Sequence, residues 1–380
     1  MKIVFAGGGS GGHILPIIAI IREMRKLSPK EEIEFFYIGP KDDFTSLLLS
    51  QENIKIKPTT SGKIRRYSDK KSLFLNFIDL VFKIPFGVFQ SFFQLFFLAP
   101  DLIFSKGGFG SVPTVVAGWL LQIPIFVHES DSIPGLSNKF SAKFAKKVFT
   151  SFPKTTDFKE DKMILVGNPI RRNLLNGTVE EAKENFDLTG RKPVILILGG
   201  SQGAQRVNDL FLEIIPKLVR DFEIIHQCGE KNYQQVNREA KILTKDFLHK
   251  YYHPFGFLKE HQLKSAYAAC DIIVSRAGAG SIFEIAAVGK PSILIPLPES
   301  AQNHQINNAY KYADSGASIV LESTNFTPNF FLQKLKNLFD NPEKLEDMKE
   351  KTKKFAKPLA AQKIATYILS YLNLIIVKNE

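Results

Sequence analysis

The first residues that could do chemistry form a glycine-dense turn that ends in a histidine. Residues 7–13 read GGGSGGH, and three of these glycines have the G-x-G-x-x-G spacing of a turn that holds a diphosphate. Such glycines let backbone N–H groups approach a pyrophosphate at the N-terminus of a helix. A nicotinamide dinucleotide also needs an acidic residue at the end of the second strand, and the strand expected over 33–38 ends without one. We therefore predict a phosphate site in which His13 is either a base, a hydrogen-bond donor or a structural residue.

Two further segments could bind phosphate. GGSQGA, residues 199–204, follows an apolar run and could present free N–H groups at a helix start, although a tight turn needs glycine for its geometry alone. In SRAGAGSIFE, residues 275–284, the Glu284 carboxylate could accept hydrogen bonds from both hydroxyls of a ribose. Ser281 and Glu284 also have the spacing of a capping box, so both interpretations stay open.

Two polar clusters follow expected strands. HESD, residues 128–131, ends a strand at the edge where parallel sheets bind ligands. QNHQINN, residues 302–308, carries amides that suit sugar hydroxyls but are also common in loops. The sequence has no HExxH, GKS/T, CxxC or GxSxG element, which leaves zinc-hydrolase, P-loop and serine-hydrolase chemistry without support.

Composition limits the class of protein. A chain of 380 residues exceeds what one hydrophobic core usually organises, so we expect two domains. The net charge of +12 indicates an anionic partner such as nucleic acid, a phosphorylated substrate or lipid head groups. Cys228 and Cys270 provide neither a disulfide framework nor a metal cluster, which indicates a reducing compartment. The first apolar run is shorter than a signal peptide requires, so we expect a cytoplasmic protein.

Phenylalanine is concentrated in one segment, with nine of the 33 between residues 74 and 97. Polar residues interrupt the apolar run, which favours a core helix or an interfacial helix over a transmembrane one. The interfacial interpretation gains support from basic residues just upstream, because these suit anionic head groups. The spacing predicts that one helix face carries Phe82, Phe86, Phe89, Phe93 and Phe96, next to Arg65, Arg66, Lys70 and Lys71.

Apolar strands and amphipathic helices alternate in both halves of the chain, which predicts parallel, doubly wound sheets. Each half opens with an apolar strand, a glycine turn and a helix. We expect strands over 3–6, 34–38, 102–105, 125–128, 193–198, 222–227, 271–275 and 292–296, and helices over 16–27, 112–121, 262–269, 281–288 and 360–372.

Taken in order, these motifs resemble the MurG family of bacterial peptidoglycan enzymes, which are inverting glycosyltransferases. The matching segments are GGGSGGHILP (7–16), SKGGFGSVP (105–113), HESDSIPGLSNK (128–139), GNPIRR (167–172), GGSQGA (199–204), SRAGAGSIFEIAAVGKP (275–291) and NHQINNA (303–309). The resemblance implies an α/β fold of two Rossmann-like doubly wound domains that face each other across a cleft, named GT-B. It places an N-terminal acceptor- and membrane-binding domain at 1–166 and a UDP-sugar-binding domain at 167–355, with the C-terminal helix, 356–380, packed back on the first.

The resemblance implies UDP-N-acetylglucosamine as the donor, with no required cofactor and no metal. Ser201 and the loop 279–282 would contact its diphosphate, Glu284 its ribose, Leu258 its uracil, and Gln305 with His304 its sugar. The full set implied for the donor is Ser10, Gly11, Gly12, Asp131, Arg171, Ser201, Leu258, Ala279, Gly280, Ser281, Ile282, Glu284, His304 and Gln305.

The implied acceptor is lipid I, undecaprenyl-diphosphate carrying N-acetylmuramoyl-pentapeptide, and the product is the β-1,4-linked disaccharide of lipid II. The acceptor pyrophosphate would contact Gly9, Gly107, Gly108, Gly110 and Ser111. His13 is our candidate for the catalytic base or its partner, and Glu129 and Asp131 are the alternatives. The family commonly carries Asn at the position of Asp131, and a carboxylate there can accept but not donate a hydrogen bond.

The same resemblance implies a peripheral enzyme at the cytoplasmic face of the plasma (inner) membrane, in contact with anionic lipids, with Trp119 contributing to docking. Other cell-wall synthesis proteins are expected partners, and nucleic acid is not. Three other functions remain possible from the sequence. They are a related transferase that acts on diacylglycerol, a nicotinamide-dependent oxidoreductase and a non-catalytic membrane-surface protein.

Overall fold

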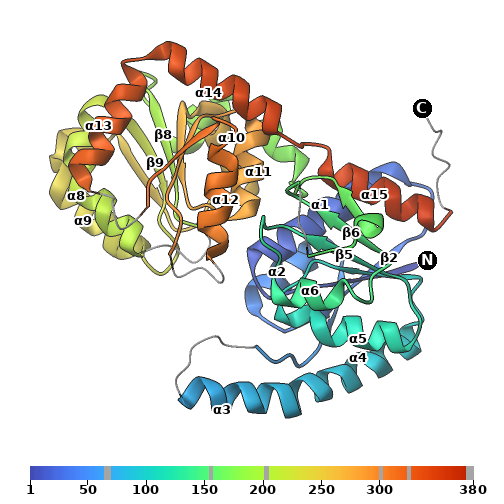
Figure 1. Ribbon diagram of the computed structural model, residues 1–380. Helices are drawn as coiled ribbons and strands as arrows, with labels where there is room; N and C mark the ends of the chain where they lie inside the picture. The colour runs from blue at the N-terminus through green and yellow to red at the C-terminus, as the bar shows by residue number, and fades with distance from the viewer. Residues whose placement is uncertain (64–69, 154–156, 201–204, 299–302, 323–326, 374–380) are drawn as a thin grey trace. The chain divides into compact units, whose positions relative to one another are not determined.

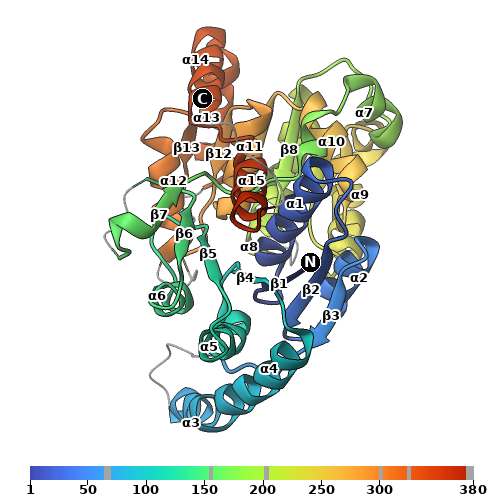
Figure 2. The same cartoon turned by 90° about the vertical axis from the view of Figure 1, so that its right-hand side faces the viewer.

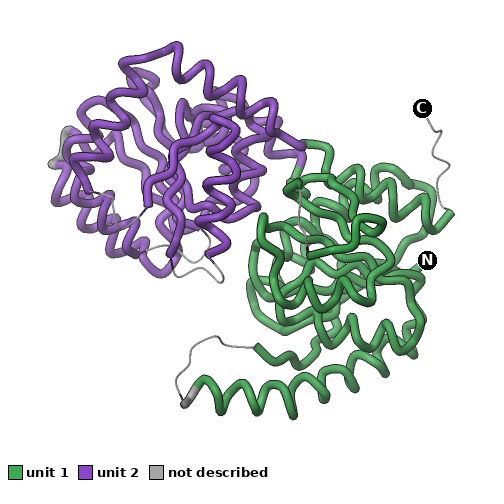
Figure 3. Tube along the Cα trace, in the orientation of Figure 1, with its two compact units in different colours: residues 1–171, 358–380 green, residues 172–357 purple. Residues whose placement is uncertain are grey.

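The computed structural model consists of two compact α/β units (Figures 1 and 3) and describes residues 1–63, 70–153, 157–200, 205–298, 303–322 and 327–373. The first unit comprises Met1–Arg171 and Pro358–Glu380, and the second comprises Arg172–Lys357. The divisions fall at 171/172 and 357/358, near the expected boundaries at 166/167 and 355/356.

The first unit is built on a seven-stranded parallel sheet of order β3-β2-β1-β4-β5-β6-β7. The order reverses direction between β1 and β4, so the chain leaves these two neighbouring strands towards opposite sides. The strands are β1 (Lys2–Ala6), β2 (Glu34–Gly39), β3 (Lys55–Pro58), β4 (Leu102–Ser105), β5 (Ile125–Glu129), β6 (Lys147–Thr150) and β7 (Met163–Leu165).

Helices cover both faces of this sheet, which is why its central strands are apolar on both sides. One core cluster joins β1 and β4 to α1 and to the C-terminal helix, and the other joins them to α4 and α5. The helices of this unit are α1 (Gly11–Leu27), α2 (Asp43–Gln51), α3 (Lys70–Ile78), α4 (Ile84–Leu98), α5 (Val112–Leu120), α6 (Leu136–Ser141) and α15 (Ala360–Tyr371).

α3, a π-helical turn over Asp79–Lys83 and α4 form one continuous helical run, of which α4 packs against α5 (Figures 1 and 2). Pro85 lies just after the π turn, and a proline cannot donate a backbone hydrogen bond, so a local change in winding is expected there. The buried carboxylate of Asp79 accepts a hydrogen bond from the Lys63 N–H at 3.0 Å and pairs with Lys83 at 2.7 Å. The turn is therefore anchored to the chain that precedes the helix.

The second unit has a six-stranded parallel sheet of order β10-β9-β8-β11-β12-β13, which reverses direction between β8 and β11. Its buried strands and helices form a separate core around α8. The strands are β8 (Val194–Leu198), β9 (Glu223–Gln227), β10 (Tyr252–Phe255), β11 (Ile272–Ser275), β12 (Ser292–Leu294) and β13 (Ser318–Val320). The helices are α7 (Val179–Phe186), α8 (Gln205–Asp221), α9 (Tyr233–His249), α10 (Glu260–Ala269), α11 (Ala279–Val288), α12 (His304–Ala313), α13 (Pro328–Phe339) and α14 (Pro342–Phe355).

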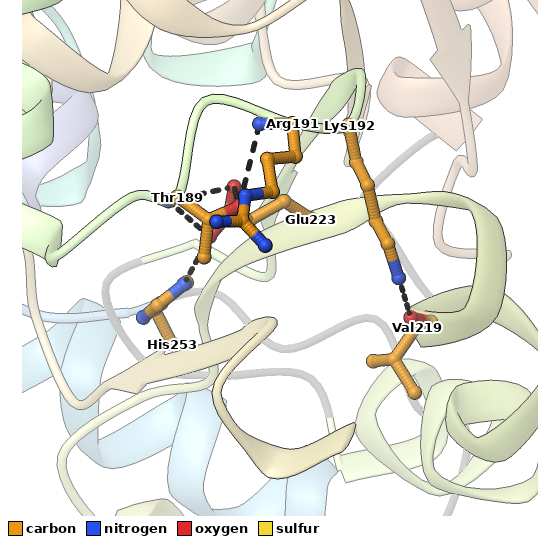
Figure 4. A network of polar contacts seen from close by, with 6 residues as sticks. All are labelled: Thr189, Arg191, Lys192, Val219, Glu223 and His253. Atoms are coloured by element: carbon orange, nitrogen blue, oxygen red, sulfur yellow. Dashed lines mark hydrogen bonds and ion pairs between the residues drawn. The ribbon is translucent and has the colours of Figure 1, made fainter. Parts of the chain in front are cut away.

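A buried polar network fixes the amino end of this second sheet (Figure 4). The fully buried carboxylate of Glu223, at the start of β9, accepts from the Thr189 N–H at 3.0 Å and the Thr189 hydroxyl at 3.1 Å. His253 of β10 lies 3.2 Å from the same carboxylate. Lys192 donates to the Val219 carbonyl at 2.7 Å. This network joins two strands to the loop before β8, at the opposite end of the sheet from its glycine loops.

Candidate functional site

Glycine loops lie at the reversal point of the first sheet, where open α/β sheets bind ligands. The loop after β1 contacts the loop after β4, because the Gly8 N–H donates to the Gly107 carbonyl at 3.0 Å. Gly107 and Gly108 both have positive φ, of 88° and 79°. A Cβ at Gly108 would lie 2.8 Å from Nε2 of His13 and 3.1 Å from the Gly8 nitrogen. This close approach requires glycine and brings His13 against both loops.

His13 lies in the first turn of α1, which begins at Gly11 and not at Pro16 as expected. Ser10 is the N-cap residue but makes no side-chain cap hydrogen bond. The first N–H groups of α1 therefore point out of the helix beside the imidazole, together with the positive end of the helix dipole. The pKa of His13 is lowered to about 4, because burial and the Lys106 charge oppose the imidazolium. The imidazole is neutral at pH 7.

Glu129 organises the loop that follows β5. One carboxylate oxygen accepts from the Asp131 N–H at 2.9 Å, and the other accepts from the Gly135 N–H at 3.0 Å and the Asn138 amide at 2.9 Å. Burial and the neighbouring Asp131 raise the pKa of Glu129 to about 7. With both oxygens occupied, Glu129 is better placed to hold the loop than to take a proton from a substrate. Asp131 remains half-exposed.

The other residues expected at the acceptor have varied surroundings. A Cβ at Gly9 would lie 2.6 Å from an oxygen of the Asp42 carboxylate, so this position has no room for a side chain. Gly110 packs against Pro40. The Ser111 hydroxyl is buried and donates to the Gly108 carbonyl at 3.0 Å. Of the expected set, Gly107, Gly108 and Gly110 therefore lie against the loop that follows β1, since a Cβ at Gly110 would lie 2.5 Å from the Gly7 carbonyl oxygen.

The second sheet also has glycine loops at its reversal point. Gly200, after β8, has a φ of 86°, and the neighbouring Gly199 carbonyl accepts a hydrogen bond from the Arg276 guanidinium at 3.4 Å. Arg276 follows β11 directly, so it ties the two loops together and adds positive charge beside them. Sequence reasoning missed Arg276, although its position between an apolar strand and GAGS was a usable signal. Ser201 lies outside the described residues.

The capping-box interpretation of Ser281 and Glu284 is wrong. α11 begins at Ala279 with Gly278 as its N-cap residue, so Ser281 lies within the first turn and Glu284 near the middle of the helix. Glu284 instead accepts a hydrogen bond from the buried Tyr267 hydroxyl at 3.0 Å. Tyr267, on α10, is a second residue that the sequence did not single out. Tyr267 holds the Glu284 carboxylate less than two turns from the N-terminus of α11. A helix N-terminus is a position that suits a diphosphate.

The remaining donor residues are placed as follows. The Leu258 N–H donates to the Gln227 side-chain oxygen at 3.1 Å, so this N–H is already used within the protein and not by uracil. The Gln305 side chain accepts from the Leu297 N–H at 3.1 Å, and His304 begins α12. Arg171 is buried at the end of the first unit. Ala279 and Ile282 are buried, whereas Gly280 and Ser281 are partly exposed.

The phenylalanine face is exposed, so for these five residues the core-helix interpretation is wrong. The exposed fractions are 61% for Phe82, 55% for Phe86, 61% for Phe89, 43% for Phe93 and 59% for Phe96. The opposite face of α4 is buried and carries small or aliphatic residues: Gly87, Ser91, Leu95 and Leu98. By length and composition alone, Ser72–Leu98 is the one helix of the described chain that could cross a membrane.

Trp119 of α5 is also exposed, by 51%, and its ring centroid lies 5.0 Å from that of Phe144. Arg65 and Arg66 lie outside the described residues. Lys70 and Lys71 begin α3, but their side chains are not among the described ones.

Comparison with known proteins identifies the class. The family model of the glycosyltransferase family 28 N-terminal domain matches residues 3–150, and that of its C-terminal domain matches residues 194–364. The crystal structure of Acinetobacter baumannii MurG has the same fold, with a TM-score of 0.73 at 24% identity, covering 97% of this chain and 99% of that one. Two parallel-sheet units with glycine loops at their reversal points thus constitute the GT-B fold of a glycosyltransferase.

Two curated relatives carry the same name, UDP-N-acetylglucosamine--N-acetylmuramyl-(pentapeptide) pyrophosphoryl-undecaprenol N-acetylglucosamine transferase. The one from Clostridium tetani is 39% identical over 353 residues, covering 92% of this chain and 93% of the relative. The one from Clostridium botulinum is 38% identical over 342 residues, covering 90% and 91%. The chain belongs to this family of N-acetylglucosamine transferases. The nicotinamide-dependent and non-catalytic alternatives are therefore not supported.

Proposed function

We propose that this chain transfers N-acetylglucosamine from UDP-N-acetylglucosamine to the 4-hydroxyl of the N-acetylmuramoyl sugar of lipid I, and so makes lipid II. The observation that carries the proposal is the pair of glycine-loop sites at the sheet reversal points. One of them lies beside His13, and the other lies beside Glu284. The names of the relatives at 36–39% identity supply the donor and acceptor.

The second unit is proposed to hold the donor. The N–H groups that begin α11 and the Arg276 guanidinium suit a diphosphate, since both oppose its negative charge. Glu284, held by Tyr267, is suited to accept from the two ribose hydroxyls. Gln305 and His304, in the first turn of α12, are proposed to contact the sugar. These contacts require no cofactor.

The first unit is proposed to hold the acceptor pyrophosphate, with Gly107, Gly108 and the start of α1 as its main contacts. In the reaction, the acceptor hydroxyl oxygen forms a bond to the anomeric carbon of the donor sugar while the bond from that carbon to the UDP oxygen breaks. The hydroxyl proton goes to His13, whose neutral imidazole can accept it, with Asp131 favouring the imidazolium that forms. The electron pair of the broken bond leaves on UDP, whose negative charge is stabilised by the Arg276 guanidinium and the N–H groups that begin α11.

The enzyme is proposed to work as a peripheral protein at the cytoplasmic face of the plasma membrane. The exposed phenylalanine face of α4 supports this, because such a face is stable when it enters the lipid boundary. The opposite face of α4 packs against α5, which favours a helix that lies on the membrane over one that crosses it. The net charge of +12 suits anionic lipids.

The test is transfer of radiolabelled N-acetylglucosamine to two acceptors side by side, a lipid I analogue and diacylglycerol. We expect label in the lipid I analogue only. Transfer to diacylglycerol in its place would support the related lipid transferase and overturn the proposal.

A further inference from the structure

Lys106 is a buried lysine that is not among the site residues expected from the sequence. It follows β4 directly, its N–H donates to the Ala6 carbonyl at 2.8 Å, and its side chain is 1% exposed. Its ammonium donates to the Ser130 hydroxyl. An ammonium removed from water costs several kcal/mol unless opposite charges compensate, so a lysine at this depth needs partners.

The partners of the Lys106 ammonium are the candidate catalytic residues His13, Glu129 and Asp131, together with His128. We call these four residues the candidate catalytic cluster. The Ser130 hydroxyl that accepts from the ammonium stands between Glu129 and Asp131 in the chain, and both carboxylates attract the lysine charge. A Cβ at Gly7 would lie 3.8 Å from the Lys106 Cβ and 3.4 Å from the His13 Cβ, so the lysine and the histidine flank the same glycine. His128, next to Glu129 on β5, is also affected by the lysine charge. Lys106 therefore supplies the positive charge among two carboxylates and two imidazoles.

The pKa values in the cluster reflect this arrangement. Burial lowers the pKa of Lys106 to about 8, against the pull of Glu129 and Asp131. The lysine charge, added to burial, lowers the pKa of both His13 and His128. Because electrostatic interactions are mutual, the ammonium also favours the ionised form of each carboxylate.

We propose that Lys106 is a positioning residue of the transferase, whose buried ammonium keeps the His13 imidazole neutral and favours the ionised forms of the Glu129 and Asp131 carboxylates. The proposal rests on the proposed function, because it assigns the proton acceptor to this cluster. It also accounts for Asp131, which stands where the resembling family commonly has Asn. The additional negative charge beside Glu129 is balanced by the buried lysine.

Removal of the Lys106 charge is expected to shift the pKa of the catalytic base in the same direction whichever group of the cluster takes the proton. Removing a positive charge raises the pKa of an imidazole and of a carboxylate alike. The acidic limb of the kcat/KM profile, which reports the base in the free enzyme, must therefore move to higher pH. In Lys106→Met we expect a move of about one to three pH units, the usual effect of one nearby charge.

The matched control is Lys106→Arg, which keeps the charge and should keep the acidic limb within about half a unit of the wild type. UDP binding, which we assign to the second unit, should be unchanged in both variants and reports that they are folded. An acidic limb that stays in place in folded Lys106→Met would overturn the proposal.

A second measurement does not depend on transfer activity. The His13 imidazole is followed by NMR from pH 4 to pH 8, with its signal assigned by comparison with His13→Gln. We expect His13 to stay neutral above pH 5 in the wild type and its pKa to rise in Lys106→Met. A wild-type His13 that titrates near pH 6.5 would contradict the proposal even if Lys106→Met did not fold. Absence of transfer by the wild type would count against the proposed function alone.

Discussion

At the scale of single residues, the donor site depends on how one carboxylate is held. Glu284 of α11 accepts a hydrogen bond from the Tyr267 hydroxyl at 3.0 Å, and we propose that the same carboxylate accepts from the ribose hydroxyls. A hydroxyl bonded to a carboxylate contributes about 1.5–3 kcal/mol, or roughly ten- to hundredfold in affinity.

We therefore expect Glu284→Ala to weaken UDP-N-acetylglucosamine binding by at least about tenfold, as measured by titration calorimetry. Tyr267→Phe is the control, because it removes the positioning hydroxyl and keeps the carboxylate. It should weaken binding less than Glu284→Ala does. Equal affinity of Glu284→Ala and the wild type would leave Glu284 with a structural role only.

The sequence identified some residues in and around the candidate catalytic cluster of the first unit and missed others, for a physical reason. His13, Glu129 and Asp131 stand beside glycine turns or strand ends, where ligand-binding residues concentrate. Lys106 and Asn138 were missed because sequence alone does not reveal that a lysine is buried or that an amide reaches back to a strand end. Asn138 donates to both Glu129 and the His128 carbonyl.

At the scale of elements, most expected strands agree with the structure, and α5 and α15 begin where expected, whereas α1, α10 and α11 begin earlier than expected. α1 begins five residues before Pro16, with two glycines in its first turn, and α11 begins two residues before Ser281. Glycine has poor helix propensity, so a pattern of apolar residues places both starts too late. The short strands β3, β6, β7, β10 and β13 were not expected, since a mixed run such as KIKP has no clear alternation.

The phenylalanine face of α4 gives the prediction at this scale. Replacing Phe89 and Phe93 by Ser should reduce binding to vesicles that contain anionic lipid by about tenfold or more, because two exposed aromatic rings no longer enter the lipid. Turnover of a water-soluble acceptor should be retained, since neither ring is buried.

The matched control places the same change on the other unit. Ile242 and Leu243 of α9 are exposed by 74% and 42%, and their replacement by Ser should leave vesicle binding unchanged. Loss of vesicle binding in both double variants would indicate non-specific adhesion and contradict a docking role for α4.

At the scale of the whole molecule, the two units repeat one design. Each has a parallel sheet whose order reverses once, and each carries glycine loops on the two strands at that reversal. The sequence predicted this repetition because both halves open with strand, glycine turn and helix. Parallel strands with helical crossovers allow few other topologies. Fold geometry alone does not specify the acceptor, because the same two-unit architecture serves many chemistries.

The most direct test of the central claim is the structure of the product. Purified enzyme is given UDP-N-acetylglucosamine and a lipid I analogue, and the new glycosidic bond is examined by NMR. We predict a β linkage to the 4-hydroxyl of the N-acetylmuramoyl sugar, formed with inversion at the anomeric carbon. An α linkage, or no sugar on the lipid I analogue at all, would contradict the account.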